Sequence, residues 1–196
     1  MSPKYSVTAA NRKNWDDLLE LFGRSGAYWG CWCMYWRFSS KEFNQTKSDN
    51  HKISLQVLVD QQDYVPGMLA YKDQRPVGWI GFGPRSKLER LNRSRVISKF
   101  DEQEVLSVIC FFIHKKHRNA GVATSLLNRT IDYAKRNNFP AIEAYPINLE
   151  AEVDIDPTHA FMGITSLFSK FGFEEVSKTK STAGGRQRVV MRLNLS

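Results

Sequence analysis

The sequence lacks several features that would narrow its class at once. Its longest uninterrupted apolar run, Val108–Ile113, is far shorter than the roughly 18 residues that a membrane span needs. The opening residues, MSPKYSVTAA, contain no apolar segment of the kind that a secretory signal requires. The 3 cysteines are odd in number and do not make a disulfide framework. These absences predict a cytoplasmic protein with reduced thiols.

The composition is that of an ordinary globular protein, and 196 residues favour one domain spanning 1–196. Lys and Arg total 28 against 20 Asp and Glu, and this net charge of +8 suggests an anionic partner. Nucleic acid, an acidic surface and a phosphorylated cofactor would all qualify, and solubility alone is the simpler alternative. The cations crowd into the stretches 85–95 and 115–118, whereas 143–156 contains acidic residues and no Lys or Arg.

Hydrophobic periodicity predicts an α/β protein with a mixed sheet. Trp15, Leu18, Leu19 and Phe22 have the spacing of an amphipathic helix. The strongest signal begins with an apolar run at 104–113, typical of a strand that is covered on both faces. A short basic turn, a helix over about 122–136 and a strand at 141–145 follow, which implies two parallel strands with a right-handed crossover. Further strands are expected at 4–8, 67–72, 76–82 and toward the C-terminal end, with helices over about 49–62 and 164–171.

The turn Arg118–Ala123 lies where this buried strand passes into a helix. Free backbone N–H groups and the positive end of the helix dipole converge at such a point, which favours an anion. Gly121 has no Cβ, so a phosphate could approach the backbone, and Thr124 adds a hydroxyl. No P-loop or GxGxxG motif is present. The turn therefore predicts a pyrophosphate cradle, the alternative being a helix start whose glycine serves packing.

This segment, Arg118-x-x-Gly121-x-Ala123 after the strand VICFFI, resembles motif A of the GNAT superfamily, the Gcn5-related N-acetyltransferases. The order of elements agrees along nearly the whole chain. The sequence also resembles a subgroup with a CWC-type aromatic motif, matched here by Cys31–Met34, Val77–Trp79, Pro84-Arg85 and Tyr145-Pro146.

The resemblance implies a seven-stranded, mostly antiparallel sheet in which the parallel central strands four and five splay apart, with helices on its flanks. It implies an acetyl-CoA-dependent N-acetyltransferase in which a primary amine of a small molecule or peptide attacks the thioester directly. Acetyl-CoA is the expected co-substrate, without a metal, and a homodimer is a common assembly among the proteins that the chain resembles. The pantetheine arm of the cofactor would pair with the backbone at the end of the fourth strand, where a backbone amide would also stabilise the oxyanion that forms during transfer. The pyrophosphate of the cofactor would bind the backbone amides of the turn that follows. The residues concerned are Phe111, Phe112 and Ile113 on the strand and Arg118, Asn119, Ala120, Gly121, Val122, Ala123 and Thr124 at the turn.

The proton-transfer groups depart from the family pattern. Phe168 stands where many members have a tyrosine that protonates the leaving thiolate, and Ser107 stands where some have a glutamate base. An amine that is charged at pH 7 must lose a proton before it attacks, so a group must accept that proton. The candidate acceptors are Glu143, Glu104 or water relayed to the acidic loop, and the alternative for Glu143 is a solvated or ion-paired carboxylate. Tyr145 is a candidate for the acid that Phe168 cannot provide.

An aromatic loop is the part most peculiar to this chain: Tyr28, Trp29, Trp32, Tyr35 and Trp36 fall close together. We expect Trp32 and Trp36, with Trp79, to line the acceptor pocket by apolar or cation–π contact, the alternative being core packing. The acidic stretch after Glu143 could attract a cationic amine. Cys31 and Cys33 lack the second cysteine pair of a zinc site, so packing is their favoured role.

Two other function classes remain open. A catalytically silent acyl-CoA-binding module would explain Phe168. A nucleic-acid-binding protein would explain the charge of +8 and the 85–95 cluster, although the acidic 143–156 stretch and the absence of a nucleic-acid motif count against it.

Overall fold

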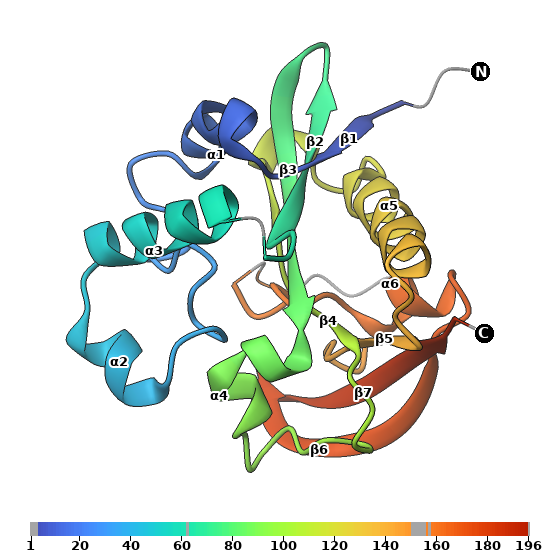
Figure 1. Cartoon of the computed structure of the whole chain (residues 1–196). Helices are drawn as coiled ribbons and strands as arrows, with labels where there is room; N and C mark the ends of the chain where they lie inside the picture. Colours follow the sequence, from blue (N-terminus) through green and yellow to red (C-terminus); the bar gives the residue numbers. More distant parts are fainter. Residues whose placement is uncertain (1–3, 62, 150–155, 157, 196) are drawn as a thin grey trace.

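Alternating strands and helices build one seven-stranded mixed sheet in the computed structural model, which describes residues 4–61, 63–149, 156 and 158–195 (Figure 1). The strand order is β1-β2-β3-β4-β5-β7-β6. The strands are β1 Ser6–Ala9, β2 Gly67–Lys72, β3 Arg75–Pro84, β4 Leu106–Ile113, β5 Ala141–Ala144, β6 Glu174–Ala183 and β7 Arg186–Asn194. The helices are α1 Trp15–Phe22, α2 Ser40–Gln45, α3 Ser48–Gln61, α4 Glu89–Asn92, α5 Val122–Arg136 and α6 Thr165–Ser169, with 3₁₀ turns η1 Arg12–Asn14, η2 Arg85–Lys87 and η3 Lys115–His117.

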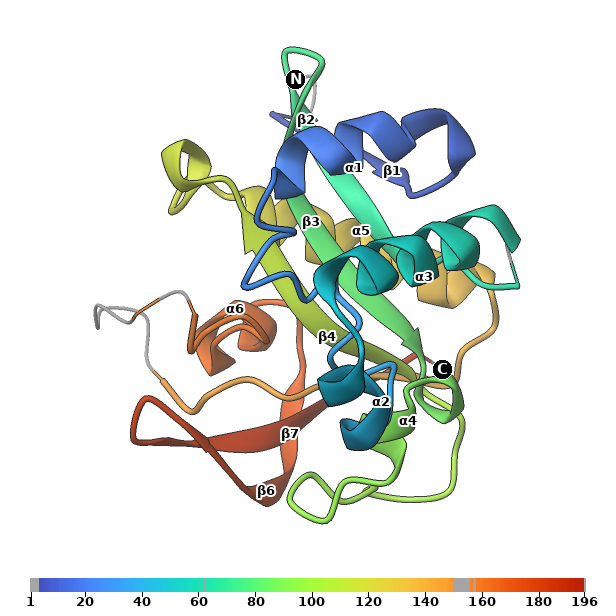
Figure 2. The same ribbon diagram turned by 90° about the vertical axis from the view of Figure 1, so that its left-hand side faces the viewer.

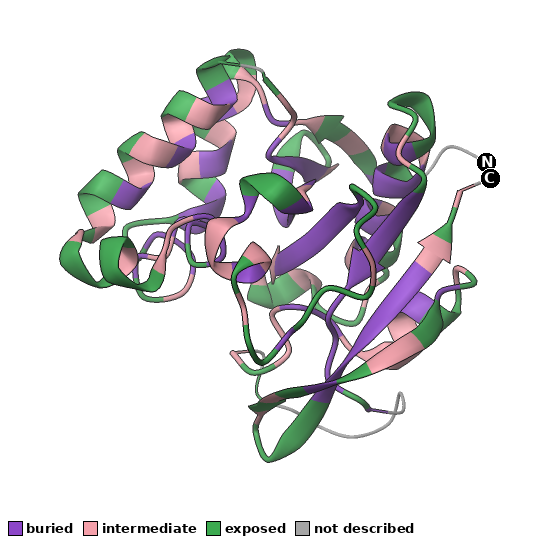
Figure 3. Ribbon diagram, turned by 60° about the horizontal axis from the view of Figure 1, so that its bottom comes forward, coloured by how far each residue is buried: buried purple, intermediate pink, exposed green. Residues whose placement is uncertain are grey.

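The helices cover the sheet from both sides. Helix α5 packs on one face, where its apolar positions meet Ile80, Val108 and Ile142 (Figures 1 and 2). Helices α1 and α3 cover the other face, together with the aromatic loop between α1 and α2. The central strands are consequently buried, whereas β6, at the edge of the sheet, is largely exposed (Figure 3).

The pairing of β4 with β5 is parallel, and every other strand pair is antiparallel. It covers Leu106–Val108 against Ile142–Ala144, and β4 then continues to Ile113 without β5 but still paired with β3. This confirms the predicted fold class and the parallel central pair. We refer below to the point where the two strands part as the fork.

A bulge at Ile109 shifts the side-chain alternation of β4. Gly81 pairs with Cys110 and Phe82 with Val108, so Ile109 is the extra residue. Cys110 and Phe112 therefore face α1 and the aromatic loop, whereas Phe111 faces α5 and α6. The bulge determines which side chains border the fork on each face.

Candidate active site

The turn between β4 and α5 has the geometry of an anion cradle. Asn119 and Gly121 both adopt left-handed backbone conformations, with φ of 55° and 90°. Gly121 is the N-cap of α5, and no side chain caps the helix there. The amide groups of the first turn lack intrahelical partners, so those of Val122, Ala123 and Thr124 are left to an external acceptor.

The cradle is unobstructed beside Gly121, and side chains near the N-terminus hold its backbone in place. A Cβ added at Gly121 would meet nothing within 4 Å. The carbonyl oxygen of Ala120 accepts hydrogen bonds from Lys4 Nζ and Tyr5 Oη, each at 3.1 Å. Arg118 is exposed and donates from Nε to Ile113 O at 3.3 Å, so its guanidinium is held beside the end of β4. The backbone amides and Arg118 together make this the anion-binding end of the sheet.

The edge of β4 beyond the fork is covered by a turn at 160–163. The Phe111 N–H, which points toward the gap, donates to Phe161 O at 2.6 Å. Gly163 adopts a φ of 89° there, and a Cβ on it would lie 2.6 Å from the ring of Phe168. Arg188 of β7 holds this segment, donating to His159 O at 2.9 Å and to Tyr145 O at 3.1 Å. The Phe111 amide, one of the backbone groups predicted to bind the pantetheine arm, is thus already hydrogen-bonded within the protein.

A buried ionic cluster lies below the fork, where β4 and β5 are still paired. Glu143 of β5 accepts from Arg85 at 3.4 Å and from Arg192 at 3.5 Å, and all three side chains are at least nine-tenths buried. Tyr145 Oη donates to Glu143 at 2.9 Å and receives a hydrogen bond from Arg85 at 2.7 Å. Ser107 Oγ lies 2.8 Å from the same phenol oxygen. Glu143 therefore has the ion-paired setting that was the alternative to a catalytic role.

The other predicted proton-transfer groups occupy different settings. Burial raises the pKa of Tyr145, with the charge of Arg85 opposing that shift, so this phenol holds its proton firmly. Glu104 lies ahead of β4, at the opposite end of that strand from the cradle, and accepts from the Ser86 N–H at 3.1 Å. Phe168 is fully buried between Phe111 and Phe173. The structure thus groups Glu143 with Tyr145 but places neither beside the cradle.

The three tryptophans predicted to bind the acceptor are all buried, with exposures of 5% for Trp32, 8% for Trp36 and 0% for Trp79. Trp32 Nε1 donates to Ser48 Oγ at 3.0 Å, and Trp79 Nε1 donates to Cys33 Sγ at 3.3 Å. Their burial matches the core-packing alternative. The exposed aromatic side chains of the loop are instead Trp29, at 91%, and Tyr35, at 40%.

Tyr28 of the same loop lies against β4. Its ring meets the Phe112 ring edge-on, with centroids 5.3 Å apart. Burial raises the pKa of Tyr28, the charge of Arg118 opposes the shift, and Cys110, Asp156 and Cys31 add to it. Tyr28 consequently packs on the part of β4 that continues past the fork.

The thiols differ in their environments. A hydrogen bond from the Cys110 thiol lowers the pKa of Cys33, whereas burial raises the pKa of Cys31 to about 11. Among the described residues, no group of three or more His, Cys, Asp or Glu side chains is arranged to hold a metal ion. The acidic stretch that was predicted to attract a cationic amine includes Glu150, Glu152 and Asp154, which lie outside the described residues.

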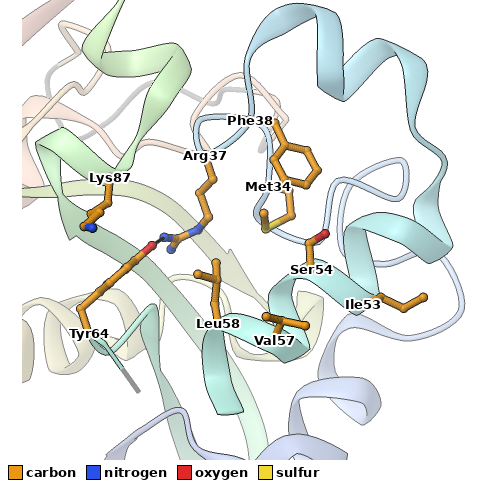
Figure 4. Close-up of a pocket in the computed structure, with 9 residues that line it drawn as sticks. All are labelled: Met34, Arg37, Phe38, Ile53, Ser54, Val57, Leu58, Tyr64 and Lys87. Atoms are coloured by element: carbon orange, nitrogen blue, oxygen red, sulfur yellow. Dashed lines mark hydrogen bonds between the residues drawn. The ribbon is translucent and has the colours of Figure 1, made fainter. Parts of the chain in front are cut away.

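A separate pocket of about 270 Å³ opens between α3 and η2 (Figure 4). Arg37 forms its base, donating to Tyr64 Oη at 2.9 Å and to Pro66 O at 2.7 Å. Arg37 also binds Phe82 O, and Gly83 next to it pairs with Ser107, so the pocket lies at the opposite end of the sheet from the cradle. None of the three predicted tryptophans lines it; the lining residues are Met34, Arg37, Phe38, Ile53, Ser54, Val57, Leu58, Tyr64 and Lys87.

Sequence reasoning missed the roles of Arg85, Arg192 and Tyr28. Arg85 belonged to a stretch interpreted as a basic patch, yet it is buried, and Arg93 in that stretch pairs with Glu89 at 2.9 Å. One signal was present in the sequence. Glu143 lies among apolar residues of a short strand, and a carboxylate in that position requires a buried counter-charge.

The comparisons with known proteins agree with this geometry. The model of the acetyltransferase (GNAT) family matches residues 27–161, more than half of the chain, and the chain belongs to that family. The predicted family is therefore confirmed, whereas membership of the CWC subgroup stays a prediction. A comparison with curated protein sequences found no match. In the part of the chain that the structure describes, no helix is long and apolar enough to cross a membrane.

Solved structures share the fold at low sequence identity. An N-acetyltransferase from Staphylococcus aureus Mu50 is 13% identical, with a TM-score of 0.57 over 99% of this chain and 100% of the other. A structure described as an acetyltransferase from Salmonella typhimurium with its cofactor acetyl-CoA is 15% identical, with a TM-score of 0.57 over 99% and 95%. A ribosomal-protein-alanine N-acetyltransferase from Brucella melitensis is 15% identical, with a TM-score of 0.56 over 97% and 99%.

Proposed function

We propose that this acetyltransferase binds acetyl-CoA and transfers the acetyl group to a primary amine of a small molecule or peptide, by direct attack in a ternary complex. The observation that carries the proposal is the uncapped N-terminus of α5, opened by Gly121 and placed directly after the strand that borders the fork. Family membership and the acetyl-CoA of the Salmonella structure support the same cofactor.

The residues of the cradle suit a pyrophosphate. The amides of Arg118 to Thr124 would hold the phosphate oxygens, and the Arg118 guanidinium would add a charged donor. Bound acetyl-CoA would supply an activated acetyl thioester. The edge of β4 at Phe111–Ile113 would orient the arm that carries it, and a backbone amide of this stretch would stabilise the developing oxyanion. Since Phe161 O already occupies the Phe111 amide, that contact would have to exchange.

Glu143, Glu104 and Tyr145 stay predictions as proton-transfer residues. Glu143 is buried and ion-paired with both Arg85 and Arg192, which is the alternative to its catalytic role. The acceptor contacts of Trp32, Trp36 and Trp79 likewise stay predictions, and their burial leaves little of each ring accessible to an acceptor.

A titration by calorimetry with acetyl-CoA tests the proposal, using the wild type, Gly121→Glu and Gly185→Glu. The two glycines are matched, because both have positive φ (90° and 73°) and open space where a Cβ would be. A carboxylate about 4 Å from a phosphate costs about 1 kcal/mol in water and about 4 kcal/mol at an effective dielectric constant near 20. That range corresponds to roughly fivefold to a thousandfold weaker binding.

We expect saturable binding by the wild type and by Gly185→Glu, with the loss confined to Gly121→Glu. An amine panel then follows the release of the CoA thiol. No binding by the wild type would refute the proposal. Binding without turnover on any amine would establish instead the silent acyl-CoA module, which the buried Phe168 favours.

A further inference from the structure

Cleavage of a thioester by an amine leaves a thiolate that gains a proton, and a side-chain donor positioned at the fork would accelerate this step. Phe168, which faces the fork from α6, has no hydroxyl. The Tyr145 hydroxyl is already hydrogen-bonded to Glu143, Arg85 and Ser107 in the buried cluster. The donor has to come from another element.

The chain has 7 tyrosines, and most of their hydroxyls are bound within the protein. The bound hydroxyls are those of Tyr5, Tyr64, Tyr71, Tyr133 and Tyr145. Among the described residues, the hydroxyls of Tyr28 and Tyr35 have no hydrogen-bond partner. Tyr35 is turned away from the sheet edge, since its ring packs against Arg90 at 4.1 Å and Phe43 at 5.4 Å.

Tyr28 is the one of these two that borders β4. Its ring packs on Phe112 of β4, the strand that leads to the cradle, and Phe112 pairs with Trp79 of β3. The loop that carries it passes in front of β4 between α1 and α6 (Figure 2). Its side chain is half-buried, so part of it stays accessible to a ligand.

We propose that Tyr28 is the general acid of the acetyl transfer, donating its phenolic proton to the thiolate sulfur as the carbon–sulfur bond breaks. This inference rests on the proposed function. The amine nitrogen forms the new bond to the acetyl carbon, and the electron pair of the carbon–sulfur bond passes to sulfur. The proton that the nitrogen then loses restores the Tyr28 phenol, directly or through water, so the enzyme ends unchanged.

The surroundings of Tyr28 suit this role. The groups that act on its hydroxyl are Arg118 after η3, Cys110 of β4, Asp156 between β5 and α6, and Cys31 of its own loop. Burial is the largest influence and raises the pKa of Tyr28, so the phenol is protonated throughout the neutral range. A protonated donor is the form that a leaving thiolate requires.

The test compares Tyr28→Phe with Tyr35→Phe, a matched loss of a free hydroxyl from the same loop. Hydroxylamine serves as the probe acceptor because it is uncharged at neutral pH and needs no base; an amine from the panel replaces it if it is not acetylated. We expect kcat for Tyr28→Phe to fall about 100-fold or more. Its acetyl-CoA affinity and unfolding midpoint should match the wild type, and Tyr35→Phe should retain wild-type kcat.

A second measurement separates proton donation from packing. Replacement of Tyr28 by 3-fluorotyrosine, a more acidic phenol of nearly the same shape, should retain activity and move the alkaline limb of kcat/KM to lower pH. The same replacement at Tyr35 should leave the profile in place. Full activity in Tyr28→Phe, or an unmoved alkaline limb, would overturn the inference alone. A wild type that acetylates no amine would overturn the proposed function with it.

Discussion

Replacing Glu143 by glutamine removes a single charge from the buried cluster while keeping the size of the side chain. Arg85 and Arg192 then share the interior without their carboxylate, and each has an exposure of 4% or less. Arg192 keeps Asp101 at 2.7 Å, whereas Arg85 keeps neutral acceptors, the carbonyls of Leu91 and Ile97 among them. Breaking a buried ion pair in this way costs about 3–5 kcal/mol.

Urea unfolding followed by circular dichroism measures this loss. With a slope of about 1–3 kcal/mol per molar urea, the midpoint should fall by about 1 M or more. Glu89→Gln is the control, because its pair with Arg93 is exposed, at 39% and 76% of the side chains. That variant should lose about 0.2–1 kcal/mol at most.

Activity measured on the same two variants decides how Glu143 functions. If Glu143→Gln unfolds at the wild-type urea concentration but no longer transfers acetyl groups, the carboxylate is the catalytic base and the reasoning from its ion pairs is wrong. If both properties fall together, the cluster is chiefly structural.

Three further perturbations have defined outcomes. Phe168→Tyr should lower the unfolding free energy by about 1–3 kcal/mol without raising the acetyl-transfer rate, because its hydroxyl would press on the Gly163 backbone; a faster enzyme of unchanged stability would contradict this. Arg188→Ala should speed hydrogen exchange of the Phe111 amide about tenfold or more, since the charge-assisted hydrogen bonds from Arg188 to His159 O and to Tyr145 O are lost; an unchanged exchange rate would show that the 160–163 turn keeps its place without Arg188. Cys33→Ser should abolish the first thiolate absorbance transition in a pH titration, because the Cys110 hydrogen bond lowers the pKa of Cys33, and retention of that transition would assign it to another thiol.

The elements with regular periodicity were predictable. The helix Trp15–Phe22 and the strand Gly67–Lys72 have the predicted bounds, and the helix predicted over about 122–136 is α5. In these segments local spacing and burial agree, since each has one apolar face toward the same sheet. The short helices α2 and α4 were not predicted, because four to six residues carry too little periodicity.

The cradle was predictable for the same local reason, since a glycine at a strand-to-helix turn acts through its own backbone. The surroundings of the fork were not. The contact of Phe161 with Phe111 and that of Arg192 with Glu143 join segments 50 and 49 residues apart. The local sequence of one segment does not predict which distant segment it will contact. The aromatic loop shows the same limit: its rings were evident, but the direction in which each one points follows from left-handed backbone at Trp29, Trp32 and Cys33.

The short pairing of β4 with β5 has a mechanical consequence. Strands β1–β4 and β5–β7 form two plates, and in the sheet ladder they are joined by the Leu106–Val108 pairing alone. The cluster around Glu143 lies at this seam and ties β5 to β7 and to the end of β3. The seam is therefore a short junction between the two plates, with the Glu143 cluster at one end and the fork, covered by the turn at 160–163, at the other. A ligand bound at the fork would contact both plates, so ligand-induced protection from hydrogen exchange should extend to the β6–β7 hairpin.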